Sequence, residues 1–139
     1  MIHMCESASQ TLTLNSVNSS SRLLVSNVRS ESFTASVFCE GFSAIARVCT
    51  YTDAHGLPNF LERLSRFDKA WSQTEHWENI EGNFQLFADC SSLGSVRFGL
   101  KLRPDNSQEW SATVYFDTEF GQLRQIALDA RKVFGPSPY

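Results

Sequence analysis

Between residues 84 and 116 the chain alternates apolar and polar positions in three separate runs. Their apolar members are Phe84, Leu86, Ala88 and Cys90, then Val96, Phe98, Leu100 and Leu102, and finally Trp110, Ala112, Val114 and Phe116. A period of two is typical of strands that bury one face. Turn-forming residues separate the runs at 91–94 and at 104–109. We therefore predict an antiparallel meander of strands in this half of the chain, opened by an earlier alternating stretch that begins at Trp77.

The first half of the chain carries the same period less regularly. Turn-forming residues divide it into four apolar-rich stretches, and we predict strands within residues 11–14, 22–28, 33–39 and 42–52. The dipeptide Glu40-Gly41 lies between the last two stretches and offers a tight turn. These two strands are therefore expected to form a hairpin.

Two segments change to the period of a helix. The apolar residues of the first are Leu57, Phe60, Leu61, Leu64, Phe67 and Trp71, and those of the second are Leu123, Ile126, Ala127, Ala130, Val133 and Phe134. Gly121 precedes the second helix, and Gly135-Pro136 ends it. Because each helix has a single apolar stripe, both should cover the same face of the sheet. The predicted fold class is α+β: a two-layer sandwich of a meandering antiparallel sheet with two helices packed on one face.

Length and composition limit the classes of protein that the chain can belong to. A chain of 139 residues is expected to form a single domain, here residues 9–135, with flexible tails at 1–8 and 136–139. Its 42% hydrophobic and 19% charged residues are typical of a globular protein. A net charge of −3 gives little support to a nucleic-acid or membrane-surface protein. No secretory signal or membrane-spanning run is visible, so we expect a cytoplasmic protein.

The sequence shows no metal-binding or cofactor-binding pattern. Its cysteines are Cys5, Cys39, Cys49 and Cys90, and their wide spacing offers no Cys-x-x-Cys pair. No glycine-rich phosphate loop is present either. We therefore expect no metal and no cofactor.

Histidines provide the only candidates for acid–base chemistry. His55 has Asp53 nearby and His76 has Glu75 and Glu78, but neither histidine adjoins a serine or cysteine in a recognisable nucleophile motif. The chain is therefore predicted not to be an enzyme. The alternative hypothesis is a small enzyme or ligand-binding domain with a cleft near His55 and Trp77.

A further set of residues resembles one known family. The set comprises Gly41-Phe42-Ser43-Ala44 leading into Arg47-Val48, then Gly56-Leu57-Pro58, Phe60-Leu61, Trp71, Trp77, Glu81-Gly82, Gly94, Val96, Leu102-Arg103, Trp110 and Gly121-Gln122-Leu123. Over residues 33–135 this set resembles the bacterial domain-of-unknown-function family 6228. That family offers no enzymatic residues to carry over. One departure is Ser95, which follows Gly94 where the family is expected to have histidine.

The layout of that family is similar to WapI-type immunity proteins, which bind and neutralise a cognate secreted toxin. This likeness concerns architecture alone, and a fold does not fix a function. The resemblance implies an immunity-type inhibitor of a bacterial toxin, and hence a protein partner. Together with the missing catalytic motifs, it favours a non-enzymatic protein-binding domain.

The segment 71–78 is the first candidate for the partner-binding surface. It contains Glu75, His76, Trp77 and Glu78 and reads as a non-periodic link between the first helix and the following strands. Tryptophan is a frequent interface anchor, and carboxylates can cover a basic active site of a toxin. The alternative is that Trp77 seals the edge of the core.

The second candidate surface is the outward face of the last strands. Phe87, Arg97 and Tyr115 occupy outward positions there, and the predicted hairpins place Arg97 near Phe87 or Asp89 on one side and near Tyr115 on the other. Such a cluster suits a cation–π contact or a recognition patch. An RNA-binding sheet would also expose aromatic and basic residues, but the carboxylates of Asp89 and Asp117 reduce the positive charge of this face. An ordinary solvated face with cross-strand pairs is the remaining interpretation.

Overall fold

The computed structural model describes residues 10–136. The predicted tail at residues 1–8 lies outside this range, as do Cys5 and residues 137–139. The elements follow the order β1 (Leu12–Asn15), β2 (Arg22–Ser26), β3 (Ser32–Cys39), β4 (Phe42–Cys49), α2 (Gly56–Ser65), β5 (Glu75–Glu78), β6 (Phe84–Cys90), β7 (Ser95–Leu102), β8 (Ala112–Glu119), the short 3₁₀ helix η1 (Phe120–Gln122) and α3 (Leu123–Phe134).

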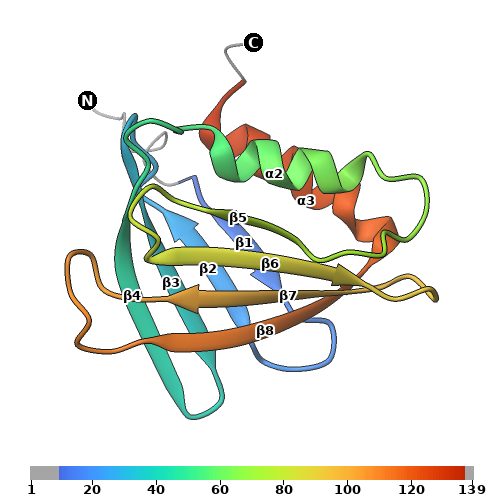
Figure 1. Ribbon diagram of the computed structural model, residues 1–139, viewed down its shortest axis with the longest axis horizontal. Helices are drawn as coiled ribbons and strands as arrows, with labels where there is room; N and C mark the ends of the chain where they lie inside the picture. The colour runs from blue at the N-terminus through green and yellow to red at the C-terminus, as the bar shows by residue number, and fades with distance from the viewer. Residues whose placement is uncertain (1–9, 137–139) are drawn as a thin grey trace, which may run out of the picture.

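Within residues 10–136 the strands form two four-stranded antiparallel sheets, with the orders β1-β2-β3-β4 and β5-β6-β7-β8. We call them the first sheet and the second sheet. Within each sheet every strand pairs with its neighbours in sequence, as in a meander. Figure 1 shows the second sheet lying across the first, with α2 and α3 together on one side of the molecule. The predicted α+β sandwich is confirmed, and the structure adds that the meander is divided into two sheets.

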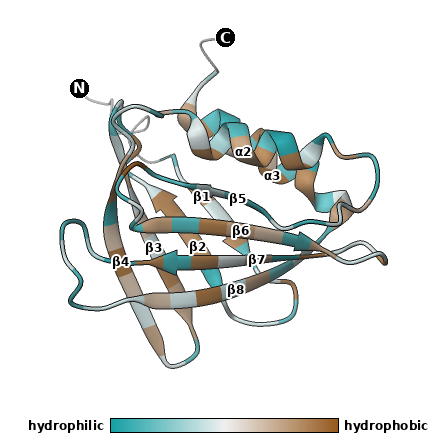
Figure 2. Cartoon of the chain, viewed as in Figure 1, coloured by the Kyte–Doolittle hydropathy of each residue, from teal (hydrophilic) through white to brown (hydrophobic). Residues whose placement is uncertain are grey.

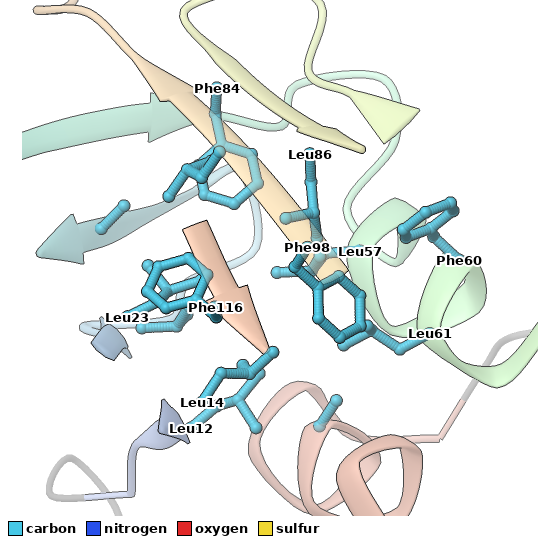
Figure 3. Close-up of a cluster of buried hydrophobic side chains, with 14 of the residues drawn as sticks. Leu12, Leu14, Leu23, Leu57, Phe60, Leu61, Phe84, Leu86, Phe98 and Phe116 are labelled. Carbon is cyan, nitrogen blue, oxygen red and sulfur yellow. The ribbon is translucent and has the colours of Figure 1, made fainter. Parts of the chain in front are cut away.

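The core fills the space between the two sheets and the helices. Apolar and polar residues alternate along the strands (Figure 2), so that each sheet turns an apolar face inward. Figure 3 shows the side chains that meet there: Leu12, Leu14 and Leu23 from the first sheet, Phe84, Leu86, Phe98 and Phe116 from the second, and Leu57, Phe60 and Leu61 from α2. Burial of this apolar surface is the main stabilising contribution to the fold.

Strand boundaries differ from the sequence prediction where local turns intervene. β2 ends at Ser26, because Asn27 adopts a φ of 50° that no strand contains. β4 ends at Cys49, because Asp53 donates its backbone N–H to the carbonyl of Thr50 in a turn. β8 begins at Ala112 rather than at Trp110. In each case the apolar pattern in the sequence extends beyond the residues that form the paired strand.

Helix α2 is shorter than its apolar stripe predicts. It ends at Ser65, and the backbone N–H of Phe67 bonds to the carbonyl of Leu64 in a tight final turn. Phe67 and Trp71 therefore belong to the following loop and not to the helix. Both still pack on the core, with ring centroids 5.0 Å apart and with the Trp71 indole donating to the carbonyl of Ala88 at 3.2 Å. Helical spacing in the sequence therefore indicated burial correctly and backbone conformation wrongly.

The segment 75–78 is a strand and not the non-periodic link that the sequence predicts. β5 pairs with β6, and Trp77 lies opposite Leu86. The alternating run expected from Trp77 to Phe84 is interrupted by a turn, in which Gly82 has a φ of 71° and donates its N–H to the carbonyl of Asn79. β5 has four residues and one inward apolar residue, which is too short a stretch for a period of two to be detected in the sequence.

Two buried asparagines join the sheets beside this turn. Asn79 and Asn83 are 2% and 1% exposed. The Asn83 amide donates to the carbonyls of Arg47 and Arg103, at 3.0 and 3.1 Å. The Asn79 amide donates to the carbonyl of Cys49 at 3.0 Å and to the Asn83 side-chain oxygen at 2.8 Å. The edge of β4 is thereby tied to the second sheet through side chains instead of through strand pairing.

The cysteine thiols in the described range are free. Cys39, Cys49 and Cys90 are half-buried. Within residues 10–136, no helix combines the length and apolar character that crossing a membrane requires.

Candidate protein-binding face

The outward face of the second sheet carries a row of aromatic residues. The register places His76 opposite Phe87, Phe87 opposite Gly99, and Gly99 opposite Tyr115. These four residues therefore lie side by side across all four strands, and we call them the aromatic row. They share one face because side chains alternate along a strand and the hairpin turns preserve the register.

Solvent reaches part of the aromatic row, because His76 and Tyr115 are exposed, Phe87 is half-buried and Gly99 is buried. The rings of His76 and Phe87 stack at 5.4 Å with an interplanar angle of 16°. Tyr115 is 55% exposed. A Cβ atom at Gly99 would lie 3.1 Å from Tyr115 Cε1, so the missing side chain allows the tyrosine ring to approach the strand closely. Glycine thus helps to build the surface, which its isolated position in the sequence did not reveal.

Charged residues border the aromatic row on one side. Arg97 donates to both carboxylate oxygens of Asp117, at 2.7 and 3.1 Å, and its guanidinium carbon lies 5.5 Å from the centroid of the Tyr115 ring. These hydrogen bonds from Arg97 lower the pKa of Asp117 and raise the pKa of Arg97. Asp89 lies opposite Arg97 on β6 and accepts a hydrogen bond from Thr74.

The other side of the row carries a different set of polar groups. Glu78, Gln85, Lys101 and Thr113 follow one another across the strands in register. His76 Nε2 lies 3.6 Å from Glu78, so the row and its border are in contact. The face thus combines aromatic surface in the middle with groups of both charges around it, an arrangement common in protein interfaces.

The structure unites the two surfaces that the sequence left as competitors. His76 and Glu78 from the first candidate surface lie on the same face as Phe87, Arg97 and Tyr115 from the second. The cause is the pairing of β5 with β6, which was not predicted. Five of the seven candidate residues therefore form one continuous surface.

Glu75 and Trp77 point to the opposite side of β5, because alternate residues of a strand face opposite ways. Glu75 pairs with Arg63 of α2 at 3.0 Å. The Trp77 indole donates to Asp53 at 2.9 Å, and its ring lies 5.8 Å from that of Phe84. These contacts connect the second sheet to α2 and to the loop before it. Both residues therefore stabilise the fold, which fits the alternative interpretation of Trp77 as a seal of the core edge.

Replacing Gly56 with alanine is expected to disrupt the contact between Trp77 and Asp53. The added Cβ would lie 2.4 Å from Trp77 Nε1 and 2.3 Å from Asp53 Oδ2, which is closer than atoms can approach. Overpacking of this kind costs about 1–3 kcal/mol. Urea unfolding of the variant measures the loss, and Gly121→Ala is the control because its Cβ meets no atom within 4 Å. Equal stability of the two variants would contradict the role assigned to Gly56.

The structure also brings together two carboxyl groups that the sequence keeps apart. Asp105 lies beside Glu81 and forms an ion pair with Arg47 at 3.1 Å. A hydrogen bond with Asp105 raises the pKa of Glu81, because two adjacent carboxyl groups do not both ionise readily. The loop between β7 and β8 creates this contact, and no sequence spacing could have indicated it. Within residues 10–136, no three His, Cys, Asp or Glu side chains are grouped as metal ligands would be.

Comparison with known proteins identifies the family but adds no biochemical role. A model described as a family of unknown function, DUF6228, matches residues 5–137. The chain belongs to this family. The match includes β1 and β2, and so extends the resemblance seen in the sequence between residues 33 and 135. No curated protein and no solved structure matches the chain. Any function of this DUF6228 member has to be argued from its surface.

Proposed function

We propose that this protein is a non-enzymatic protein-binding domain and that the aromatic row, with its charged borders, is the interface. One observation carries the proposal: the strand register gathers exposed His76, half-buried Phe87 and exposed Tyr115 on a single outward face, with Arg97 beside the tyrosine ring. Tyrosine and arginine are enriched among the residues that dominate binding energy in protein interfaces.

The shape of the face supports a protein partner over a small ligand. Small-molecule sites are concave and enclose most of the ligand. The aromatic row instead lies across an open sheet, and Tyr115 projects more than half of its surface into solvent. A broad partner surface can cover such a face, whereas a small ligand would remain largely exposed on it.

The specific partner that we propose is a bacterial toxin, which would make the protein an immunity-type inhibitor. Glu78 and Asp89 lie beside the aromatic row on its two sides, and the whole chain carries a net charge of −3. Carboxylates around aromatic anchors complement a basic surface such as the active site of a nuclease toxin, and they accelerate association by electrostatic steering. Inhibition would follow from covering that site.

RNA binding is a second use of an exposed aromatic sheet. The stacked rings of His76 and Phe87 resemble the platforms on which unpaired bases stack. Against this use, Arg97 is already neutralised by Asp117 and is not free to bind phosphate. A ligand cleft near His55 and Trp77 has less support still, because Asp53 and Phe84 occupy the surroundings of Trp77.

The decisive experiment is to co-express the chain with the product of a toxin-like reading frame beside its gene and to measure survival and affinity. Tyr115→Ala is expected to weaken binding by at least about 30-fold, which corresponds to a hot-spot loss of about 2 kcal/mol. Tyr51→Ala is the matched control, because this tyrosine is 65% exposed outside the second sheet. Circular dichroism verifies that both variants fold.

Charge reversal tests the electrostatic part of the proposal. Glu78→Lys should slow association with the toxin and leave folding intact, because Glu78 is exposed. Glu75 is not a suitable site for the same change, since it pairs with Arg63. Protection that survives both Tyr115→Ala and Glu78→Lys would exclude this face as the interface. Tight binding of single-stranded RNA that is lost in Tyr115→Ala would favour the RNA alternative.

A further inference from the structure

The free edge of β4 is a feature separate from the aromatic row. Among the described residues, 10–136, β4 is the last strand of the first sheet, and along its eight residues it pairs with β3 alone. Figure 1 shows the turn end of the β3–β4 hairpin extending past β8. Edge strands offer unpaired backbone groups to any other extended chain.

The second half of this edge is already closed. The carbonyl of Arg47 accepts a hydrogen bond from Asn83, and the carbonyl of Cys49 accepts one from Asn79. Both carbonyls must therefore point away from β3. Because backbone groups alternate in direction along an antiparallel strand, the N–H and C=O groups of Ser43 and Ile45 point to the same free edge.

The first half of the edge is open. Within the described part of the chain, no hydrogen bond reaches the backbone groups of Ser43 or Ile45. Phe42 and Ile45 are 46% and 64% exposed. The segment 42–46 contains neither a charged residue nor a proline, the residues that usually protect an edge from further pairing.

An apolar groove adjoins the open half of the edge. Its volume is about 890 Å³, and it lies between β4 and the beginning of β8. Phe38, Phe42, Ala44, Ile45, Trp110 and Ala112 supply its apolar lining. The other described residues that line the groove are Ser36, Ser43, Ser111 and Thr113, so none of the described lining residues is charged. A bound segment with uncharged side chains fits this lining, because a charged side chain would be buried there without a partner.

We propose that the open edge of β4 binds a short, uncharged, extended segment of another protein, which adds to the first sheet as a further strand. Its backbone would exchange hydrogen bonds with Ser43 and Ile45, and its apolar side chains would enter the groove beside Trp110. In this mode of recognition main-chain hydrogen bonds provide affinity and side-chain pockets provide selectivity. The site is distinct from the aromatic row and does not rest on the proposed function.

A second copy of the chain is a poorer occupant. Symmetric pairing of two β4 edges could engage only the open segment 42–46 of each copy, because the asparagines close the remainder. Stable interfaces engage about 20–30 residues and bury about 800 Å² on each partner. A contact of a few residues falls well short of that requirement, whereas it is sufficient for a short segment held by backbone hydrogen bonds.

The test uses a display library of short random peptides selected on the immobilised protein, followed by affinity measurements with the synthetic peptide that enriches most. We expect uncharged sequences with apolar residues at alternate positions. Ser43→Pro removes one edge N–H and should weaken binding at least about tenfold relative to Ser43→Ala, which keeps that N–H. Proline is tolerated where the N–H faces a free edge, so the fold should survive.

Amide hydrogen exchange on the unaltered protein provides a test that does not depend on the proline variant. The selected peptide should slow exchange at Ser43 and Ile45. Equal affinity for the Ser43→Pro and Ser43→Ala variants, or unchanged exchange at both amides, would overturn the proposal. The proposal would also be overturned if no peptide were enriched on the unaltered protein relative to a parallel selection on the Ser43→Pro variant. A concentration-dependent dimer in sedimentation that disappears in Ser43→Pro would assign the edge to a second copy and also refute it.

Discussion

Replacing Asn83 with alanine is expected to lower the free energy of unfolding by about 3 kcal/mol or more. The substitution removes the donor for the carbonyls of Arg47 and Arg103 and the acceptor for Asn79. Each buried polar group that loses its partner costs about 1–3 kcal/mol. Because Asn83 is 1% exposed, water cannot replace these bonds without opening the junction between the sheets.

Urea unfolding followed by circular dichroism measures this loss. Asn59→Ala is the control: Asn59 is an exposed residue of α2 that accepts one hydrogen bond from Arg131, and its change should stay within about 0.5 kcal/mol. A similar effect for the two variants would show that the asparagine bridge does not hold the sheets together. Amide exchange along β4 should also rise in Asn83→Ala, since that edge loses one of its side-chain contacts.

Leu64→Ala is expected to cost about 2–5 kcal/mol, the range for a fully buried aliphatic residue. Leu64 is inaccessible to solvent and lies on the inner side of α2. The sequence alone predicts the same cost for Ile126 of α3, but the structure leaves Ile126 half-buried. Ile126→Ala should therefore cost less than Leu64→Ala, because part of its side chain remains in water in the folded state.

Thermal and urea unfolding of both variants measure this order of effects. Leu128→Ala on α3 is the matched control, because Leu128 is 52% exposed and its truncation leaves no cavity. Its stability should match the unaltered protein within about 0.5 kcal/mol. A larger loss for Ile126→Ala than for Leu64→Ala would mean that α3 packs more deeply than the structure shows.

The candidate interface was partly visible in the sequence. Period-two alternation placed Phe87, Arg97 and Tyr115 on an outward face, and the structure confirms the contact of Arg97 with Tyr115. The link of this face to His76 was not predictable, because β5 is too short to show a period. The contribution of Gly99 was also hidden, since only the position of Tyr115 across the strand explains why a side chain is absent there.

Local patterning by itself determined most of the elements and their inward faces, with β5 as the main exception. Alternation marked the strands, helical spacing marked α2 and α3, and both follow from the geometry of the backbone and the tendency of apolar side chains to leave water. The two-helix, antiparallel α+β class follows from those elements, since each apolar face needs another to cover it.

Only the tertiary structure decided how these elements combine. The division into two sheets depends on where strand pairing stops, and β4 is joined to the second sheet by Asn79 and Asn83, whose partners lie 30 and 36 residues away in sequence. Hydrogen bonds between distant segments leave no period in a sequence. For the same physical reason the union of the two candidate surfaces and the open edge of β4 became visible only in three dimensions.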